Sequence, residues 1–405
     1  MQSHFSSVRV LNLTSLIANL IAFLSVVWIV VPAPAYNIWI FSVAASEWSL
    51  WLGMLALGGT VCGLLLRFLP SGLGWPSIVS LVLGGAALLI SLYPLLSVVS
   101  TARVEGVSLS PVRYFEGLQN LIRTPEHDAQ NVKTYMFAQV DGQELRLDVH
   151  LPTTNTDNIG AGVIVVHGGS WKAGERNDFP QWNQWLSEQG FAVFDVDYRI
   201  NPQPNYLTAA GDVKCAIRWI KNHAAEFRID SERLVLFGRS AGGQLALIAA
   251  YSAADERLPS SCVENQTSGD VRAVVSVYGV TDLIWSYDNP ANQCVIDGPK
   301  TLSDFVGGDP RSSENIRERF ALASPIAHVD AGTPTTLLLH GGHDQLVKSE
   351  NMRMLAERLS EAGVKHKTLF IPYAQHGFDY NFNGWGAQIS QPVILDFIMR
   401  NTLPG

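Results

Sequence analysis

The sequence predicts an α/β fold, in which a mostly parallel sheet is flanked by helices and preceded by an N-terminal bundle of about three transmembrane helices. Three observations lead to this prediction. Of the 28 Lys and Arg and 36 Asp and Glu of the chain, the first hundred residues hold only Arg9, Glu47 and Arg67. From about Ser108 onward, short apolar runs alternate with helical stretches. One of these runs leads into Ser240, which is flanked by glycines and followed by a helix of small residues.

The charge-poor region, residues 1–107, contains three apolar runs, and we expect spans near 10–31, 50–68 and 78–99. Their lengths are close to the roughly 20 residues that cross a bilayer as a helix. Buried helices of a soluble domain are the alternative, but such helices normally show a polar face. Prolines and tryptophans at the ends of the runs fit a membrane anchor.

The orientation of these spans depends on few charges. Arg9 before the first span and Arg67 between the second and third place the N-terminus inside. The sequence then predicts a multi-pass membrane protein whose C-terminal domain is extracytoplasmic. Arg103, Arg113 and Arg123 follow the third span and favour the opposite orientation.

A signal peptide is the alternative interpretation of the first run. Ala33-Pro-Ala35 has the small residues of a cleavage site. Two spans would then remain, and the C-terminal domain would still lie outside.

The four cysteines give a separate indication of the compartment. Cys62 lies in a span and Cys215 in an apolar helical stretch, so both are interpreted as packing residues. Cys262 and Cys294 lie in polar segments and could pair in an oxidising compartment. Two free thiols are an alternative of at least equal weight.

Residues 108–405 are expected to form one domain. Several of its short apolar runs are almost continuously apolar, as is typical of strands covered on both faces. The expected strands are 162–168, 191–199, 233–238, 273–279, 335–341 and 367–373, and the clearest helical patterns are 180–190, 209–227 and 351–363.

An insertion at 281–330 interrupts the alternation of strands and helices. It is rich in Asn, Asp, Pro and Ser before it becomes helical at 313–324. Long insertions in α/β domains often form lids or binding walls. A lid and a plain surface elaboration are equally compatible with this sequence.

The stretch Gly238-Arg239-Ser240-Ala241-Gly242 carries the most chemical information. It has the spacing of a nucleophile elbow and lies between a strand and a helix, as that motif requires. Gly238 and Gly242 supply the small residues needed where strand and helix nearly touch. The helix that starts beside Ser240 offers free N–H groups and the positive end of its dipole to a developing oxyanion.

A serine hydroxyl needs an imidazole base, itself oriented by a carboxylate. In an α/β-hydrolase these partners follow in the order Ser, acid, His. His376 lies just beyond an expected strand, whereas His366 begins it, so His376 is the predicted base. Asp344 lies a few residues past the preceding strand and is the predicted acid. The alternatives are Asp330, at the wrong end of that strand, and Asp379, which breaks the order.

Two segments share the letters HGG and are assigned different tasks. The upstream copy ends an early strand, where the second half of an oxyanion hole is expected. Its Gly168 and Gly169 let the backbone turn, so that N–H groups at Gly169 and Ser170 join that of Ala241, while His167 braces the loop.

The downstream copy contains His340, His343 and Asp344, which together suggest a metal site. Two glycines and a strand-to-loop turn do not hold two imidazoles on one face, as a metal-binding helix does. A metallohydrolase is therefore the weaker hypothesis, and the two histidines are interpreted as scaffold.

From about Asp141 to its end, the chain resembles the α/β-hydrolase carboxylesterases of the hormone-sensitive-lipase and feruloyl-esterase-like group. The blocks "HGGSWKAG", "GRSAGGQLA", "HGGHDQLV" and "QHGF" carry the resemblance, in the order of that group. It implies the α/β-hydrolase fold, the triad named above, and structural roles for Asp197 and Asp212. Two departures stand out, since Ser170 replaces a third glycine and Arg239 stands where an acid often occurs.

The sequence therefore predicts a membrane-anchored serine hydrolase that cleaves carboxylic esters through an acyl-enzyme. The alternatives are a peptidase or acyltransferase on the same fold, and a catalytically inactive binding module. We expect a small-molecule or lipid ester as substrate, a membrane as partner, and no nucleic acid, metal or cofactor. The oligomeric state is left open.

Overall fold

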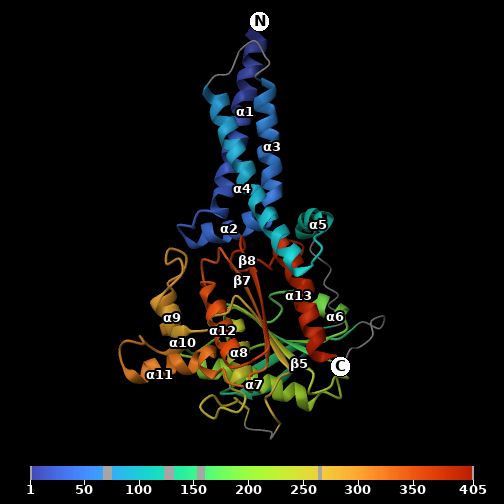
Figure 1. The fold of residues 1–405 in the computed structure, drawn as a ribbon, viewed down its shortest axis with the longest axis vertical. Helices are drawn as coiled ribbons and strands as arrows, with labels where there is room; N and C mark the ends of the chain where they lie inside the picture. The colour runs from blue at the N-terminus through green and yellow to red at the C-terminus, as the bar shows by residue number, and fades with distance from the viewer. Residues whose placement is uncertain (1, 67–74, 123–131, 153–159, 263–266, 404–405) are drawn as a thin grey trace.

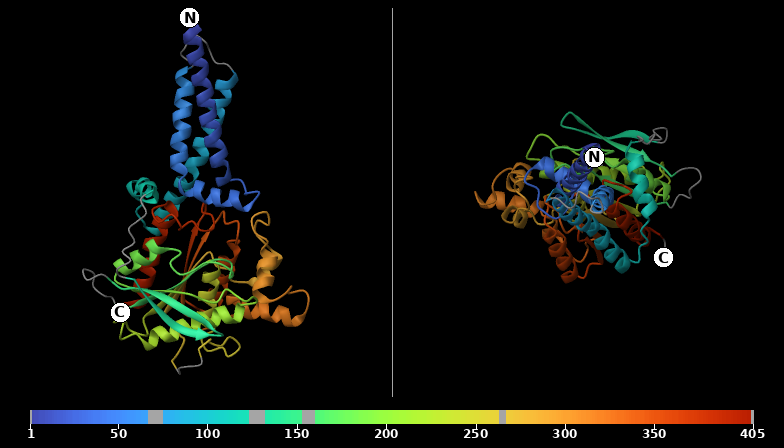
Figure 2. Two further views of the ribbon diagram at one scale, coloured as in Figure 1. Left: turned by 180° about the vertical axis from the view of Figure 1, so that it is seen from behind. Right: turned by 90° about the horizontal axis from the view of Figure 1, so that it is seen from above.

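The computed structural model describes residues 2–66, 75–122, 132–152, 160–262 and 267–403. A narrow bundle of N-terminal helices stands on a wider α/β domain (Figure 1). In the view from above, the bundle lies over that domain (Figure 2). Arg67 and Arg123, two of the residues on which the predicted orientation depends, lie outside the described residues.

In the described part of the N-terminal region, residues 2–66 and 75–107, the chain forms four α-helices and one short 3-10 turn. They are α1 (Gln2–Val26), η1 (Val27–Ile29), α2 (Tyr36–Glu47), α3 (Ser49–Leu66) and α4 (Trp75–Glu105). The segment Val10–Ile29 and helix α4 are each long and apolar enough to cross a membrane. A third span results only if α2 and α3, which meet at 80°, count as one broken span. The three predicted spans thus correspond to α1, α3 and α4. The first and the last are long and apolar enough to cross a membrane by themselves, whereas α3 qualifies only together with α2.

Helices α1, α3 and α4 pack through small and polar residues. The Asn19 side chain donates to the carbonyl oxygen of Ser80 at 2.9 Å, and the Ser15 hydroxyl donates to the carbonyl oxygen of Gly59 at 2.8 Å. A methyl group at Gly84 would collide with Asn19. Small residues that let helices approach, joined by interhelical hydrogen bonds, are typical of helix packing in membranes.

The α/β domain is built on one eight-stranded sheet in the order β1-β2-β4-β3-β5-β6-β7-β8. Strands β1 and β2 pair antiparallel with each other and β2 pairs antiparallel with β4, whereas all other pairs are parallel. The bounds are β1 (Val132–Val140), β2 (Gln143–His150), β3 (Gly162–Val166), β4 (Ala192–Val196), β5 (Leu234–Arg239), β6 (Ala273–Val277), β7 (Thr335–Gly341) and β8 (His366–Ile371).

All six predicted strands are confirmed, as is the mostly parallel sheet. The β1–β2 hairpin was not among the predicted strands. Its first strand lies at the edge of the sheet and is half exposed, so it lacks the continuous apolar run that marks β3 to β7.

Helices cover both faces of the sheet, because strand residues alternate between two cores. Ile164 and Val166 of β3 pack on one side, and Val163 and Val165 on the other. The first core includes residues of α7 (Tyr206–Asn222), α8 (Ala241–Tyr251) and α12 (Glu350–Glu361), and the second includes residues of α5 (Pro111–Ile122), α6 (Pro180–Glu188) and α13 (Trp385–Thr402).

The insertion at 281–330 is mainly helical. It forms α9 (Leu283–Asp288), α10 (Gly298–Val306), α11 (Glu314–Ala323) and the 3-10 turn η3 (Pro325–His328). These helices lie beside the sheet domain at the level of α12 (Figure 1). Phe305 and Phe320 are fully buried in the first core, so the insertion is anchored on the domain.

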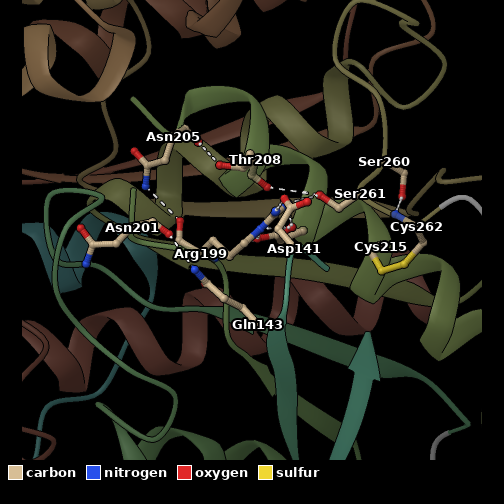
Figure 3. Close-up of polar contacts among 11 residues, drawn as sticks. Asp141, Gln143, Arg199, Asn201, Asn205, Thr208, Cys215, Ser260, Ser261 and Cys262 are labelled. Atoms are coloured by element: carbon tan, nitrogen blue, oxygen red, sulfur yellow. Dashed lines mark hydrogen bonds and ion pairs between the residues drawn. A yellow bond between two sulfur atoms is a disulfide. The ribbon is translucent and has the colours of Figure 1, made fainter. Parts of the chain in front are cut away.

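The interpretations of Cys215 and Cys262 were wrong. These two residues form a disulfide (Figure 3), so Cys215 is not a plain packing residue, and Cys262 neither pairs with Cys294 nor is a free thiol. Cys294 is exposed and free. The segment after α8 folds back onto α7, where the buried Lys214 ammonium donates to the carbonyl oxygens of Ser252 and Leu258. These contacts join segments about forty residues apart, so the periodicity of α7 alone did not reveal them.

The two carboxylates that the family resemblance marks as structural both pair with arginines. Asp212 is fully buried and accepts hydrogen bonds from the backbone N–H and the guanidinium of Arg199. The same guanidinium also contacts Asp141 and Ser261 (Figure 3). Asp197 pairs with Arg176. Neither acid reaches the predicted triad through these contacts.

Candidate active site

Ser240 stands at a sharp turn between β5 and α8. Its backbone has φ 53° and ψ −120°, a strained conformation for a residue other than glycine. A methyl group at Gly238 would collide with the carbonyl of Gly242, and one at Gly242 would collide with the carbonyl of Val166. The two glycines of the motif are therefore required by close backbone approach, as the sequence predicted.

The predicted triad residues lie within hydrogen-bonding distance of one another. The Nε2 atom of His376 lies 2.9 Å from the hydroxyl oxygen of Ser240, and its Nδ1 atom lies 2.7 Å from a carboxylate oxygen of Asp344. Asp344 and His376 follow the adjacent strands β7 and β8, whose carboxyl ends meet at one edge of the sheet. This chain of contacts can remove a proton from a serine hydroxyl.

Asp344 is held in place by its own loop. One of its carboxylate oxygens accepts from the N–H groups of Leu346 and Val347, and the other lies 3.2 Å from the Nε2 atom of His340. Burial would raise the pKa of Asp344, but attraction to His376 and hydrogen bonds from His340 and His376 outweigh it and hold the pKa well below its usual range. The acid is therefore ionised and can orient the imidazole.

The two histidines of the downstream HGG segment face different partners. The Nε2 atom of His340 lies 2.9 Å from the carbonyl oxygen of Val347, on the inner side of the acid loop. The Nδ1 atom of His343 lies 3.0 Å from the carbonyl oxygen of Ile29, and its Nε2 atom lies 3.4 Å from the hydroxyl of Tyr93. His343 thus contacts the N-terminal helices, and the two rings do not converge on a common point.

The upstream HGG loop lies directly against the elbow. A methyl group on Gly168 would stand 3.3 Å from the β-carbon of Ser240. His167 stacks on Tyr198, whose hydroxyl donates to the carbonyl oxygens of His167 and Gly168 at 3.2 Å. Ala241 begins α8, so its N–H has no carbonyl partner inside the helix. The candidate oxyanion donors at Gly169, Ser170 and Ala241 are thus on segments that flank the nucleophile.

Gly169 provides a test of this loop. Its φ of +112° is rarely adopted by side-chain-bearing residues, and a methyl group there would collide with the carbonyl of Ala173. We expect Gly169→Ala to displace the loop and to lower kcat/KM for an ester by about 100-fold, the cost of losing one oxyanion donor. Steady-state kinetics on a soluble ester measure this.

Gly363→Ala is the matched control for Gly169→Ala. Gly363 also has a positive φ, of +71°, but it lies in open space at the end of α12. The control should cost about 1 kcal/mol of stability through its backbone conformation and leave kcat/KM unchanged. Equal kinetic losses in both variants would contradict an oxyanion role for the upstream loop.

Arg239 and Asp379 form a buried ion pair beside the triad, which the sequence analysis did not anticipate. The Arg239 guanidinium donates to Asp379 at 2.6 Å, and the Tyr278 hydroxyl donates to the other carboxylate oxygen at 2.6 Å. The guanidinium carbon lies over the rings of Phe179 and Phe237, 4.1 and 4.3 Å from their centroids. Asp379 is thereby directed to Arg239, and Asp344 is the acid that contacts His376.

Replacing Asp379 by asparagine should destabilise the domain strongly. The side chain of Arg239 is only 2% exposed, so the loss of its anionic partner leaves an unpaired buried charge. We expect a loss of about 3–5 kcal/mol in the free energy of unfolding, measured by chemical denaturation. Asp396→Asn, which breaks an exposed pair with Arg400, should cost less than about 1 kcal/mol. Similar losses in the two variants would contradict the prediction.

Two cavities adjoin the triad, one beside Ser240 and the other beside His376. The smaller one, about 60 Å³, is lined by Ser170, Ser240 and Ala241 together with residues of the insertion, among them Leu302. The larger one, about 320 Å³, is lined by His376 and by residues of α2. The insertion at 281–330 therefore forms a wall of the cavity beside Ser240, and an N-terminal helix forms a wall of the cavity beside His376.

The BD-FAE family model matches residues 147–359. Among curated proteins, the probable carboxylic ester hydrolase LipM of Mycobacterium tuberculosis is 30% identical over 220 residues, which are 54% of this chain and 49% of that protein. Esterase LipC of the same organism is 32% identical over 54% of this chain and 53% of its own length. The chain thus spans about half the length of these two relatives.

A shorter relative is covered more fully. The ethyl acetate hydrolase of Pseudomonas putida is 30% identical over 275 residues, which are 66% of this chain and 81% of that protein. Among solved structures, a thermophilic esterase of the planctomycete Thermogutta terrifontis, Est2, has a TM-score of 0.55 at 25% identity. The match covers 68% of this chain and 94% of Est2, and it confirms the α/β-hydrolase fold.

Proposed function

Since the chain belongs to the BD-FAE family of α/β-hydrolase esterases, we propose that it is a membrane-anchored serine carboxylesterase. The observation that carries the proposal is the continuous contact from Ser240 through His376 to Asp344. Esterases are also frequent among the relatives, which include the ethyl acetate hydrolase named above.

The proposed reaction proceeds through an acyl-enzyme. The Ser240 hydroxyl oxygen attacks the ester carbonyl while His376 accepts its proton, and the carbonyl oxygen becomes an oxyanion beside the N–H groups of Gly169, Ser170 and Ala241. The intermediate collapses, the carbon–oxygen bond to the alcohol breaks, and His376 gives its proton to the leaving alcohol. Water then attacks the acyl-enzyme by the same steps and releases the acid.

The N-terminal helices are proposed to hold this domain at a membrane. Helices α1 and α4 have the length and composition of spans. Hydrogen bonds from Ser15 and Asn19 of α1 into α3 and α4 favour a retained helix over a cleaved signal peptide. The Cys215–Cys262 disulfide favours an extracytoplasmic domain, because disulfides persist in oxidising compartments.

A fluorophosphonate probe tests the proposed nucleophile. We expect the full-length protein in detergent to form a covalent adduct on Ser240, located by mass spectrometry of its peptides. Ser240→Ala should not be labelled, whereas Ser360→Ala, a change on the exposed face of α12, should be labelled like the parent. Absence of Ser240-dependent labelling would reject the serine-hydrolase mechanism and favour an inactive binding module.

A further inference from the structure

The larger cavity beside the triad is walled by the N-terminal helix α2, which runs across the lower end of the bundle above the ends of β7 and β8 (Figure 1). The residues that line this cavity from α2 and from the position just after it are almost all apolar or aromatic. They are Tyr36, Trp39, Ile40, Val43, Ala44, Glu47 and Trp48. The opposite side is formed by Phe179, Gly377, Tyr380, Asn381 and the base His376. At about 320 Å³ the cavity reaches the lower range of small-molecule sites, roughly 300–1,000 Å³.

We propose that this cavity binds the apolar alcohol portion of the substrate, so that the enzyme cleaves short-chain acyl esters of membrane-embedded lipid alcohols. The inference rests on the proposed function, since it identifies the substrate class of the same site.

The chemistry decides which part of an ester lies in which cavity. The acyl group becomes bonded to the Ser240 oxygen, so it occupies the cavity that Ser170, Ser240 and Ala241 line. The leaving alcohol oxygen receives its proton from His376, so the alcohol lies on the side of that imidazole. The cavity on the Ser240 side is about 60 Å³ and the cavity on the His376 side about 320 Å³. A short acyl group and a larger apolar alcohol match these sizes.

The wall formed by α2 is tied firmly to the catalytic domain. At its C-terminal end, the Glu47 carboxylate is buried and accepts a 2.9 Å hydrogen bond from the hydroxyl of Tyr373, two residues past β8. Before its N-terminal end, the N–H of Ala33 donates to the Gln345 side chain at 2.7 Å. The other Glu47 oxygen accepts a 3.4 Å hydrogen bond from the N–H of Gly386. The C-terminal end of α2 and the segment before its N-terminal end thus contact the loops after β8 and β7, which contain His376 and Asp344.

The position of α2 also gives the cavity access to lipid. Helix α2 meets α3 at 80°, so it lies nearly along the membrane surface if α3 spans the membrane with α1 and α4. Tyr36, Ile40 and Phe41 on α2 are between 42% and 51% exposed. The exposed side of α2 is thus apolar and aromatic, like the side that lines the cavity, and aromatic residues of this kind are enriched where a membrane meets water. A lipid alcohol could then enter beside α2 with its ester directed toward His376.

The test uses full-length protein in detergent and two ester series. In the first, the acyl group stays acetyl and the alcohol lengthens from ethyl to butyl, hexyl and octyl. In the second, the alcohol stays ethyl and the acid lengthens to butanoate, hexanoate and octanoate. We expect kcat/KM to rise by about tenfold or more along the alcohol series, because each buried methylene contributes binding, and to fall along the acid series.

A pair of variants on α2 locates the effect. Val43→Trp places an indole in the cavity, whereas Phe41→Trp changes an exposed residue of the same helix that does not line it. We expect the octyl-to-ethyl acetate ratio of kcat/KM to fall about tenfold in Val43→Trp and to stay at the parent value in Phe41→Trp. Fluorophosphonate labelling of Ser240 reports whether each variant is folded.

The outcomes separate the two proposals. A preference for long acids over long alcohols, or a flat alcohol series, would overturn the inference while leaving the esterase function intact. An equal ratio in Val43→Trp and Phe41→Trp would also overturn it. Hydrolysis of none of the esters by the parent would reject the proposed function and, with it, this inference.

Discussion

Replacement of Ser240 by alanine is expected to lower kcat/KM for a soluble ester such as ethyl acetate by about 10⁴-fold or more, close to complete loss. Removal of the hydroxyl abolishes the acyl-enzyme route, so that only oxyanion stabilisation and substrate binding remain, and in serine hydrolases these residual effects are small. The loss should be in kcat, since the cavity beside Ser240 keeps its walls. Initial rates over a range of substrate concentrations measure it.

Ser286→Ala is the matched control for Ser240→Ala. Ser286 lines the same cavity from helix α9, and its hydroxyl contacts the side chain of Asn351. We expect kcat to change by less than about tenfold in this variant, because one neutral hydrogen bond contributes about 1 kcal/mol. A Ser240→Ala protein that retains near-parent activity would contradict the assignment of the nucleophile.

Asp344→Asn has the second largest expected effect. The amide keeps the size of the carboxylate but removes the charge that stabilises a protonated His376, and its NH₂ group can force the wrong imidazole tautomer. We expect kcat to fall by about 10⁴-fold, as for the corresponding acid in serine proteases, with the fold preserved. The pKa of Asp344 is held below its usual range, so mild acid should not reproduce the defect of the variant.

A comparison of Asp379→Asn with Asp344→Asn distinguishes the loss of a buried structural acid from the loss of the proposed catalytic acid. Both carboxylates are about 1% exposed, and Asp379 lies three residues after His376, yet it pairs with Arg239 and Tyr278. Its substitution should therefore lower stability more than activity, whereas Asp344→Asn should lower activity more than stability. Thermal unfolding and kcat measured on both proteins compare the two effects, and the reverse ranking would exchange the roles assigned to the two acids.

Much of the hydrolase domain was predictable because its signals are local. The six predicted strands were visible as short apolar runs, and each was confirmed. The contacts of Gly238 and Gly242 around the elbow follow from the serine motif itself. The choice of His376 and Asp344 used the Ser, acid, His order of α/β-hydrolases and the position of each residue just past an expected strand, and their roles remain predictions until the variants above are measured.

Other features could not be read from local patterns. Asp379 was excluded as the catalytic acid because it follows His376 in the chain. Nothing in the sequence indicated its actual partner, Arg239, because the two residues lie 140 positions apart. Cys262 pairs with Cys215 because a loop folds back onto α7, although the polar segment around Cys294 looked equally suitable. The β1–β2 hairpin escaped notice because an exposed edge strand has no continuous apolar run.

The two HGG segments show which features the sequence predicts and which depend on tertiary structure. Steric demands between neighbouring residues and the alternation of apolar side chains were sufficient to predict the sheet and the elbow, and the known order of α/β-hydrolases supplied the order of the triad. His340 contacts Val347 of its own loop, whereas only packing between distant segments decided that His343 contacts Ile29 of the N-terminal helices. The same holds for the cavity between α2 and His376, whose walls are more than 300 residues apart in the chain. Such contacts depend on how whole elements pack, which no short window of sequence contains.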